Sequence, residues 1–118
     1  MNYTILIHDS PAALAMRSDP VRRESVFGPI FGYMKALRDA GIHVGGAGLE
    51  VPETAKTLRF RDGKRLVQDG PYADSKEQLA GFVVIDVPDF ETALDWAGRF
   101  PPMPDRVLEV RANLRPME

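Results

Sequence analysis

The sequence predicts an α+β protein in which an antiparallel sheet is covered on one face by two helices. The first observation is the order of its segments, which read as strand, helix, hairpin, strand, helix and strand. The second is Asp62-Gly63, which lies between two alternating segments and is typical of a two-residue hairpin turn. The third is the run 82–87, which is apolar at nearly every position and indicates a buried strand.

Strands are predicted wherever apolar residues alternate with polar ones or follow one another in a short run bounded by turn residues. These segments are residues 3–8, 56–61, 64–68, 82–87 and 106–111. Residues 42–51, which contain Gly45-Gly46-Ala47-Gly48, predict an irregular segment or a short edge strand. They do not predict a nucleotide-binding loop, because no helical pattern follows them.

Two helices are predicted between the strands. The first begins with Asp19 as the N-cap and Pro20 at the first helical position, and Gly41 ends it. Pro29 lies inside the predicted helix, so we expect a kink or a restart there. The second helix begins after Pro88-Asp89, and residues 12–16 are expected to form one further helical turn.

Composition excludes several classes of protein. The 118 residues fit one domain, residues 1–118, and the net charge of −2 comes without a basic cluster that could bind nucleic acid. The chain has no cysteine and two histidines, so we expect neither a metal site nor a cofactor. No apolar run approaches the roughly 20 residues of a membrane helix. We therefore expect a cytoplasmic protein without a membrane partner.

An assembly is predicted from the strand at 82–87. Val83, Ile85 and Val87 can pack under the helices, which leaves Phe82 and Val84 on the opposite face of the sheet. A solvated sheet face is normally polar, so this apolar face indicates a homodimer in which Phe82 and Val84 lie in the interface.

The chain resembles a known family along nearly its whole length. Asp69-Gly70-Pro71-Tyr72 is similar to the signature of the DGPF branch of the YCII-related (YciI-like) proteins, with Tyr72 where phenylalanine is usual. Further similar segments are 40–49, 61–64, 76–81, 85–89 and 109–111. The resemblance implies a ferredoxin-like fold of the dimeric α/β-barrel type, in which two sheets face each other. Most of the family is uncharacterised, and this branch often occurs beside extracytoplasmic-function (ECF) sigma factors.

The resemblance also implies what this chain lacks. In the small YciI-like relatives, a histidine on the first helix and an aspartate after the second helix form an acid/base pair. Counting along the chain puts these positions at or near Ile30 and Phe100, and no histidine lies between residues 20 and 41. Hydrocarbon side chains cannot carry protons, so an enzyme built on this chain would not use that pair.

The candidate site residues each have a structural and a functional interpretation. Residues 69–72 form a sharp turn, which is the interpretation we favour, or they put Asp69 and Tyr72 at a pocket as general base and hydrogen-bond donor. In the first case, valine at Gly70 should unfold the protein.

Lys76 lies in a loop that binds a polar ligand or is simply solvated. His8 is a proton shuttle beside Asp9 or, more commonly, a strand-end residue bonded to backbone. The ligand-binding candidates are Asp69, Gly70, Pro71, Tyr72 and Lys76, and the catalytic candidates are His8, Asp69 and Tyr72.

Two functions remain open. The first, which we favour, is a small-molecule-binding or accessory module that holds a mostly apolar molecule, or a protein partner, between sheet and helices. The second is a cofactor-free enzyme that performs proton transfer or elimination on a small aromatic or lactone-like substrate, by analogy with other dimeric α/β barrels. A catalytic cleft would require His8, Asp69 or Tyr72 to converge on one empty space.

Overall fold

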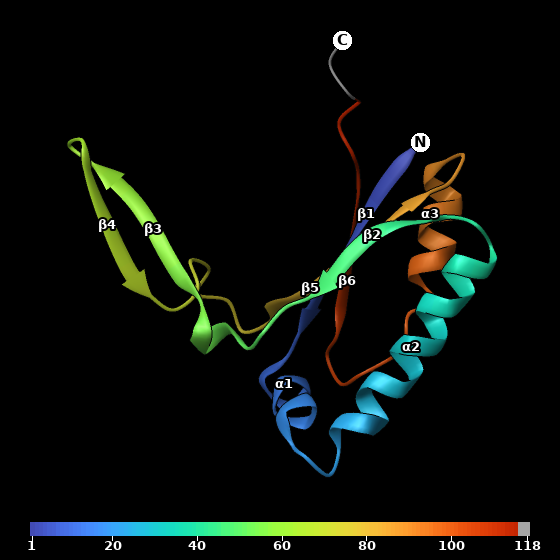
Figure 1. The fold of residues 1–118 in the computed structure, drawn as a ribbon, viewed down its shortest axis with the longest axis horizontal. Helices are drawn as coiled ribbons and strands as arrows, with labels where there is room; N and C mark the ends of the chain where they lie inside the picture. The colour runs from blue at the N-terminus through green and yellow to red at the C-terminus, as the bar shows by residue number, and fades with distance from the viewer. Residues whose placement is uncertain (116–118) are drawn as a thin grey trace.

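The structure, a computed structural model, describes residues 1–115. Four strands form the central sheet in the order β2-β5-β1-β6, and each neighbouring pair is antiparallel. The strands are β1 (Asn2–Asp9), β2 (His43–Gly48), β5 (Gln78–Asp86) and β6 (Val107–Ala112). Two crossover helices, α2 (Arg23–Asp39) and α3 (Phe90–Ala97), complete a βαββαβ order that is compatible with a ferredoxin-like fold. Both lie on the same side of the sheet (Figure 1).

Residues 1–115 contain three α-helices rather than the two predicted. The additional one, α1 (Pro11–Ser18), follows β1 directly, and it extends the single turn expected at residues 12–16. Its N-cap is Ser10, whose hydroxyl accepts a hydrogen bond from the Ala13 N–H at 3.2 Å. Proline at the first helical position needs no N–H partner, which favours this start.

The predicted boundaries of the two longer helices had mixed outcomes. The cap at Asp89 is confirmed, because its carboxylate accepts the Thr92 N–H at 2.8 Å. The predicted start at Asp19-Pro20 is wrong. The Asp19 side chain accepts the Val21 N–H at 2.9 Å and forms a turn, so α2 begins only at Arg23. The helix also continues through Pro29 without a restart, because Pro29 faces solvent, where water can satisfy the carbonyl that loses its partner.

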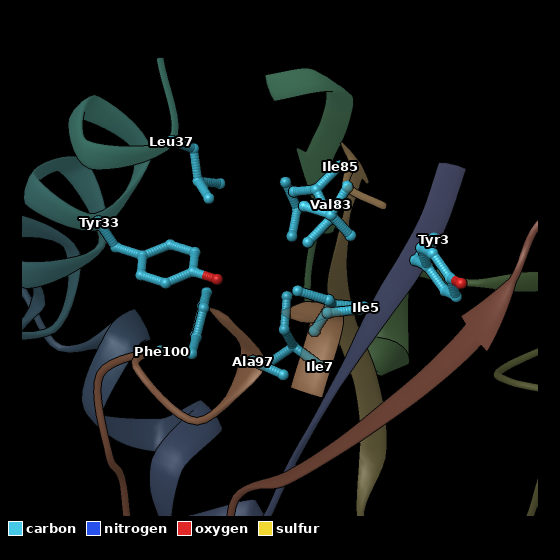
Figure 2. Close-up of a cluster of buried hydrophobic side chains, with 11 residues drawn as sticks. Tyr3, Ile5, Ile7, Tyr33, Leu37, Val83, Ile85, Ala97 and Phe100 are labelled. Carbon is cyan, nitrogen blue, oxygen red and sulfur yellow. The ribbon is translucent and has the colours of Figure 1, made fainter. Parts of the chain in front are cut away.

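The core lies between the sheet and the helices (Figure 2). Apolar residues at alternate positions of β1 and β5 face α2, α3 and Phe100. The buried cluster comprises Tyr3, Ile5, Ile7, Tyr33, Leu37, Val83, Ile85, Val87, Ala93, Ala97 and Phe100. The Tyr33 and Phe100 rings meet edge to face at a centroid distance of 5.0 Å. The predicted burial of Val83, Ile85 and Val87 under the helices is confirmed.

The opposite side of the sheet, which we call the open face, carries the alternate residues. It comprises Thr4, Leu6, His8, Phe82, Val84 and Glu109, all of them half-buried. Leu6 pairs with Phe82 on one side and with Glu109 on the other. Hydrocarbon therefore occupies the centre of this face, as the sequence predicted, and charged groups lie toward β6.

A second, two-stranded sheet projects from the body of the molecule (Figure 1). Its strands are β3 (Lys56–Arg61) and β4 (Lys64–Asp69), and we call residues 56–69 the arm. The predicted Asp62-Gly63 turn is confirmed, since both residues have positive φ angles, of 52° and 73°. A short 3-10 helix, η1 (Pro52–Thr54), precedes the arm. No helix within residues 1–115 is both long and apolar enough to cross a membrane.

Candidate functional site

A cavity of about 820 Å³ lies between α2 and the sheet, at the end where β1 meets α1. Helix α2 contributes an apolar wall, which faces Ile7, Val83 and Phe100. The residues of that wall are Val26, Phe27, Ile30, Phe31 and Met34. The apolar residues of α2 therefore have two uses: Leu37 is fully buried in the core, whereas the five residues of the wall line this cavity.

Small residues on β2 and β5 leave the cavity unfilled. Gly48 pairs with Gly81, and Gly46 pairs with Val83, so much of the floor is backbone. Two of these glycines are required by the close approach of the strands. A Cβ atom on Gly46 would lie 2.5 Å from the Phe82 carbonyl oxygen, and one on Gly81 would lie 2.9 Å from the Ala47 carbonyl oxygen. The same strand contact that demands glycine thus removes the side chains that would fill the space.

A buried ion pair closes one end of the cavity. The Arg106 Nε and Nη2 atoms donate to the two carboxylate oxygens of Asp9, at 2.6 and 2.9 Å. Arg106 Nη1 donates to the Pro101 carbonyl oxygen at 2.8 Å, and the guanidinium carbon lies 5.1 Å from the centroid of the Phe100 ring. Both charged groups are thereby satisfied, and Asp9 is not a free base.

Further charged groups lie around the cavity. Arg17 donates to the carbonyl oxygens of Leu49 and Ala80, which ties α1 to the ends of β2 and β5. The guanidinium groups of Arg17 and Arg23 lie 6.0 and 5.8 Å from the centroid of the Phe27 ring. Glu24 and Glu50 also line the cavity, so its charged residues are of both signs.

The three catalytic candidates do not converge on this space. His8 lies on the open face, on the opposite side of the sheet from the cavity, with its Nε2 atom 3.4 Å from a Glu109 carboxylate oxygen. Arg111 donates to the same carboxylate at 2.7 Å and, as the main cause, lowers the pKa of Glu109. Neither Asp69 nor Tyr72 lines the cavity.

The Asp-Gly-Pro-Tyr turn lies at the base of the arm. Lys56 pairs with Asp69 at 2.8 Å, and both side chains are exposed. The Gly70 N–H donates to the Ala55 carbonyl at 2.7 Å, and the Thr57 hydroxyl donates to the Gly70 carbonyl at 2.8 Å. Tyr72 is exposed, and the Arg59 guanidinium covers its ring at 5.2 Å. Each of these contacts is made with the arm or with Ala55, the residue directly before it.

Pro71 and Lys76 line a second, smaller cavity of about 460 Å³. Its other walls are α1, η1 and the loop before β5, and Lys76 itself is exposed. The ligand-binding candidates are therefore divided between the arm base and this shallow space, and none of them lines the larger cavity. Within residues 1–115, no three histidine, aspartate or glutamate side chains gather as metal ligands would.

A profile of the YCII-related domain matches residues 1–115. The chain belongs to the YCII-related family. This YCII-related chain is also similar to an uncharacterized protein of Rhizobium meliloti (strain 1021), with 52% identity over 48 residues. That match covers 40% of this chain and 39% of the relative, so the chain matches well under half the relative's length.

Sequence reasoning missed the pair that closes the cavity of this YCII-related protein. Asp9 and Arg106 are 97 residues apart, and neither lies in a motif. The signal lies in the strand pairing that the structure shows, because β1 and β6 pair antiparallel with His8 opposite Val107. The next residue of β1 and the one before β6 must then approach each other, and in this chain they carry opposite charges.

Proposed function

We propose that this YCII-related protein, of the DGPF branch, is a cytoplasmic homodimer that binds a small, mostly apolar molecule as an accessory or regulatory module. The observation that carries this proposal is the cavity of about 820 Å³ with an apolar wall of five α2 residues. Small-molecule sites in proteins have volumes of about 300–1,000 Å³ and are lined mainly by hydrocarbon with a few polar groups.

The chemistry of the cavity favours binding over proton transfer. Ile30 and Phe100, at or near the positions where the resemblance puts an acid/base pair, both line the cavity. Asp9 is the buried carboxylate in the wall, and it is neutralised by Arg106. A ligand with an aromatic or branched aliphatic body fits these surroundings, because its burial removes apolar area from water on both sides.

The enzymatic alternative is proton transfer or elimination on a small aromatic or lactone-like compound. It would need a base, and His8 lies on the other side of the sheet from the cavity. Asp9 could act as the base only after it leaves a bidentate ion pair, which would leave the buried Arg106 guanidinium group without its counter-charge. We therefore favour the binding module.

The proposed dimer is supported by the open face, where Leu6, Phe82 and Val84 form a half-buried apolar centre. A two-fold contact between two such faces would bury both copies of each residue. Phe82→Asp should convert the dimer to a monomer in sedimentation velocity. Val21→Asp, on an exposed turn away from the sheet, is the control. A wild-type monomer at all concentrations would contradict the assembly.

The ligand site can be tested with N-phenyl-1-naphthylamine, a neutral aromatic probe that fluoresces in apolar surroundings. We expect saturable binding that Ile30→Trp abolishes, since a larger side chain at this position fills the cavity. Leu94→Trp, on an exposed face of α3, should bind like the wild type. Native mass spectrometry of protein purified without added ligand then identifies any molecule retained from the cell. Equal binding by both variants would locate the probe elsewhere and refute the proposed site.

A further inference from the structure

One face of the arm carries an apolar cluster that stays exposed in the structure of residues 1–115. Leu58 pairs with Val67, and Phe60 is on the same face two residues along β3. These three side chains are 47%, 55% and 74% exposed, respectively. An isolated two-stranded hairpin is marginally stable in water, and exposed apolar clusters commonly mark interaction surfaces. Within residues 1–115, these three apolar side chains therefore have no second layer of structure to pack against.

The base of the arm is held in a fixed direction by the Asp-Gly-Pro-Tyr turn. An ion pair from Lys56 to Asp69 and two hydrogen bonds through Gly70 fasten the first residues of the hairpin. Arg59, which is on the opposite face from Phe60, packs over the Tyr72 ring. Thr57 and Arg59 make their contacts from the face opposite Phe60, whereas the Lys56–Asp69 pair lies at the base of the Leu58–Phe60–Val67 face. The three apolar side chains beyond it remain exposed. The turn thus acts as a brace at the base of the arm, and Leu58, Phe60 and Val67 are left exposed beyond it.

We propose that each arm packs its Leu58–Phe60–Val67 face against a second copy of this chain. The inference rests on the proposed homodimer and names a second surface that joins the two copies. Charge supports a second copy as the occupant. The arm holds five basic and two acidic residues, which leaves ten basic and fifteen acidic residues for the rest of the chain. Arg65 lies opposite Phe60 on the apolar face, so a basic group flanks the proposed contact. A positive arm therefore meets a negative body, and two-fold symmetry repeats the contact.

A nucleic acid fits the same observations less well. Three of the five basic residues of the arm, Arg59, Arg61 and Lys64, lie on the face opposite Phe60. A phosphate backbone bound by these three would leave the apolar face uncovered. The body would also repel the polyanion, because its formal charge is negative. A second copy covers the apolar face and is attracted by the charge of the arm.

The first experiment uses the absence of cysteine in the chain. Phe60→Cys is labelled with a maleimide photocross-linker, and Leu66→Cys, on the other face of the same hairpin, is the matched control. Unlabelled and ¹⁵N-labelled copies are mixed before irradiation. We expect mixed-isotope cross-links from position 60 at several times the yield from position 66. Cross-links that join position 60 only to its own copy would overturn the proposal.

The second experiment measures the dissociation constant of the dimer by sedimentation. Phe60→Ser should raise it about tenfold or more, as loss of a central aromatic contact does, whereas Leu66→Ser should leave it nearly unchanged. A dimer that is broken by Phe82→Asp but unaffected by Phe60→Ser would refute the role of the arm and leave the proposed assembly intact. A monomeric wild type would refute both. Retardation of duplex DNA that Arg61→Ser abolishes, in a protein whose dimer is insensitive to Phe60→Ser, would replace the second copy with nucleic acid.

Discussion

Asp9 and Arg106 form a bidentate ion pair at the point where β1 ends and β6 begins, with side chains only 2% and 5% exposed. The pair also fastens the proline-rich connection between α3 and β6. Arg106 donates to the Pro101 carbonyl at 2.8 Å, and the Ser10 hydroxyl donates to the Pro104 carbonyl at 2.9 Å. These contacts join the first strand, α1 and the last strand at one end of the cavity.

We expect Asp9→Asn to lower the free energy of unfolding by about 3 kcal/mol, because it leaves a buried guanidinium group without its counter-charge. Replacing both partners, as Asp9→Leu with Arg106→Met, should recover much of this loss. Urea denaturation followed by circular dichroism measures the differences. Asp39→Asn is the control, since it breaks the exposed Lys35–Asp39 pair and should cost less than about 0.5 kcal/mol.

An Asp9→Asn variant as stable as the wild type would contradict this account. The carboxylate would then contribute little to holding the end of the sheet, and its position in the cavity wall would need a functional explanation. The enzymatic alternative would gain from that result, because Asp9 would be the free base that the cavity otherwise lacks.

Local chemistry explains what could be predicted from the sequence. The Asp62-Gly63 turn, the Asp89 cap and the apolar strand at 82–87 depend on neighbouring residues, so each was predicted near its observed position. The start of α2 was misplaced because Asp19 can cap a turn as well as a helix, and only three-dimensional context decides between the two.

The candidate site was harder to predict, because its parts are distant in sequence. The cavity combines residues of α2, β1, β2 and β5 with Phe100 and Arg106, and no motif links them. The Asp-Gly-Pro-Tyr turn drew attention as a motif, yet it lies at the base of the arm and outside the larger cavity. The local sequence predicted a turn correctly, but it did not indicate that this turn supports the arm.

Gly46→Ala should strongly destabilise the protein, by about 2–3 kcal/mol, because Gly46 has a φ of 150° and its new methyl group would meet the Phe82 carbonyl oxygen at 2.5 Å. Gly48→Ala in the same strand is the matched control. Nothing lies within 4 Å of its added Cβ, so the cost should stay below about 1 kcal/mol. Equal urea midpoints for the two variants would mean that β2 and β5 can separate without penalty.

Tyr33 should make the fold sensitive to alkaline pH. Burial raises the pKa of Tyr33 to about 12, although nearby Arg99 opposes the shift. The folded pKa is above the unfolded value of 10.0, so this contribution to stability is complete below pH 10 and is lost as the pH rises toward 12. We expect a loss of about 1 kcal/mol between pH 9 and pH 11 from this group.

Tyr33→Phe isolates that effect, because it removes the titrating hydroxyl and keeps the ring against Phe100. The hydroxyl donates to the Trp96 carbonyl at 2.8 Å, and the Arg99 N–H also donates to that carbonyl, at 3.1 Å. The Trp96 carbonyl therefore keeps a hydrogen-bond donor in the variant. The variant should lose less stability than the wild type over the same pH range in urea titrations. Parallel curves for the two proteins would assign the alkaline loss to other groups.

Gly70→Val should act on the arm rather than on the whole fold. The φ angle of Gly70 is 98°, so valine is strained there by about 1–2 kcal/mol, yet nothing lies within 4 Å of the added Cβ. The strain can be relieved by rotating the base of the arm, which breaks the Gly70–Ala55 hydrogen bond and leaves the four-stranded core packed. We therefore expect a near-native urea midpoint, faster proteolysis within residues 56–69 and a weaker dimer. This differs from global unfolding, which the turn chemistry alone had indicated.

Gly63→Val is the matched control for Gly70→Val. Gly63 also has a positive φ, of 73°, and open space at its Cβ, but it lies at the tip of the arm and far from the brace. Valine there strains the turn and leaves the direction of the arm unchanged, so the dimer should weaken less. Cooperative unfolding of Gly70→Val at low urea would show instead that the arm base is part of the folding core. Equal weakening of the dimer by both variants would make the integrity of the hairpin, rather than its direction, the property that assembly requires.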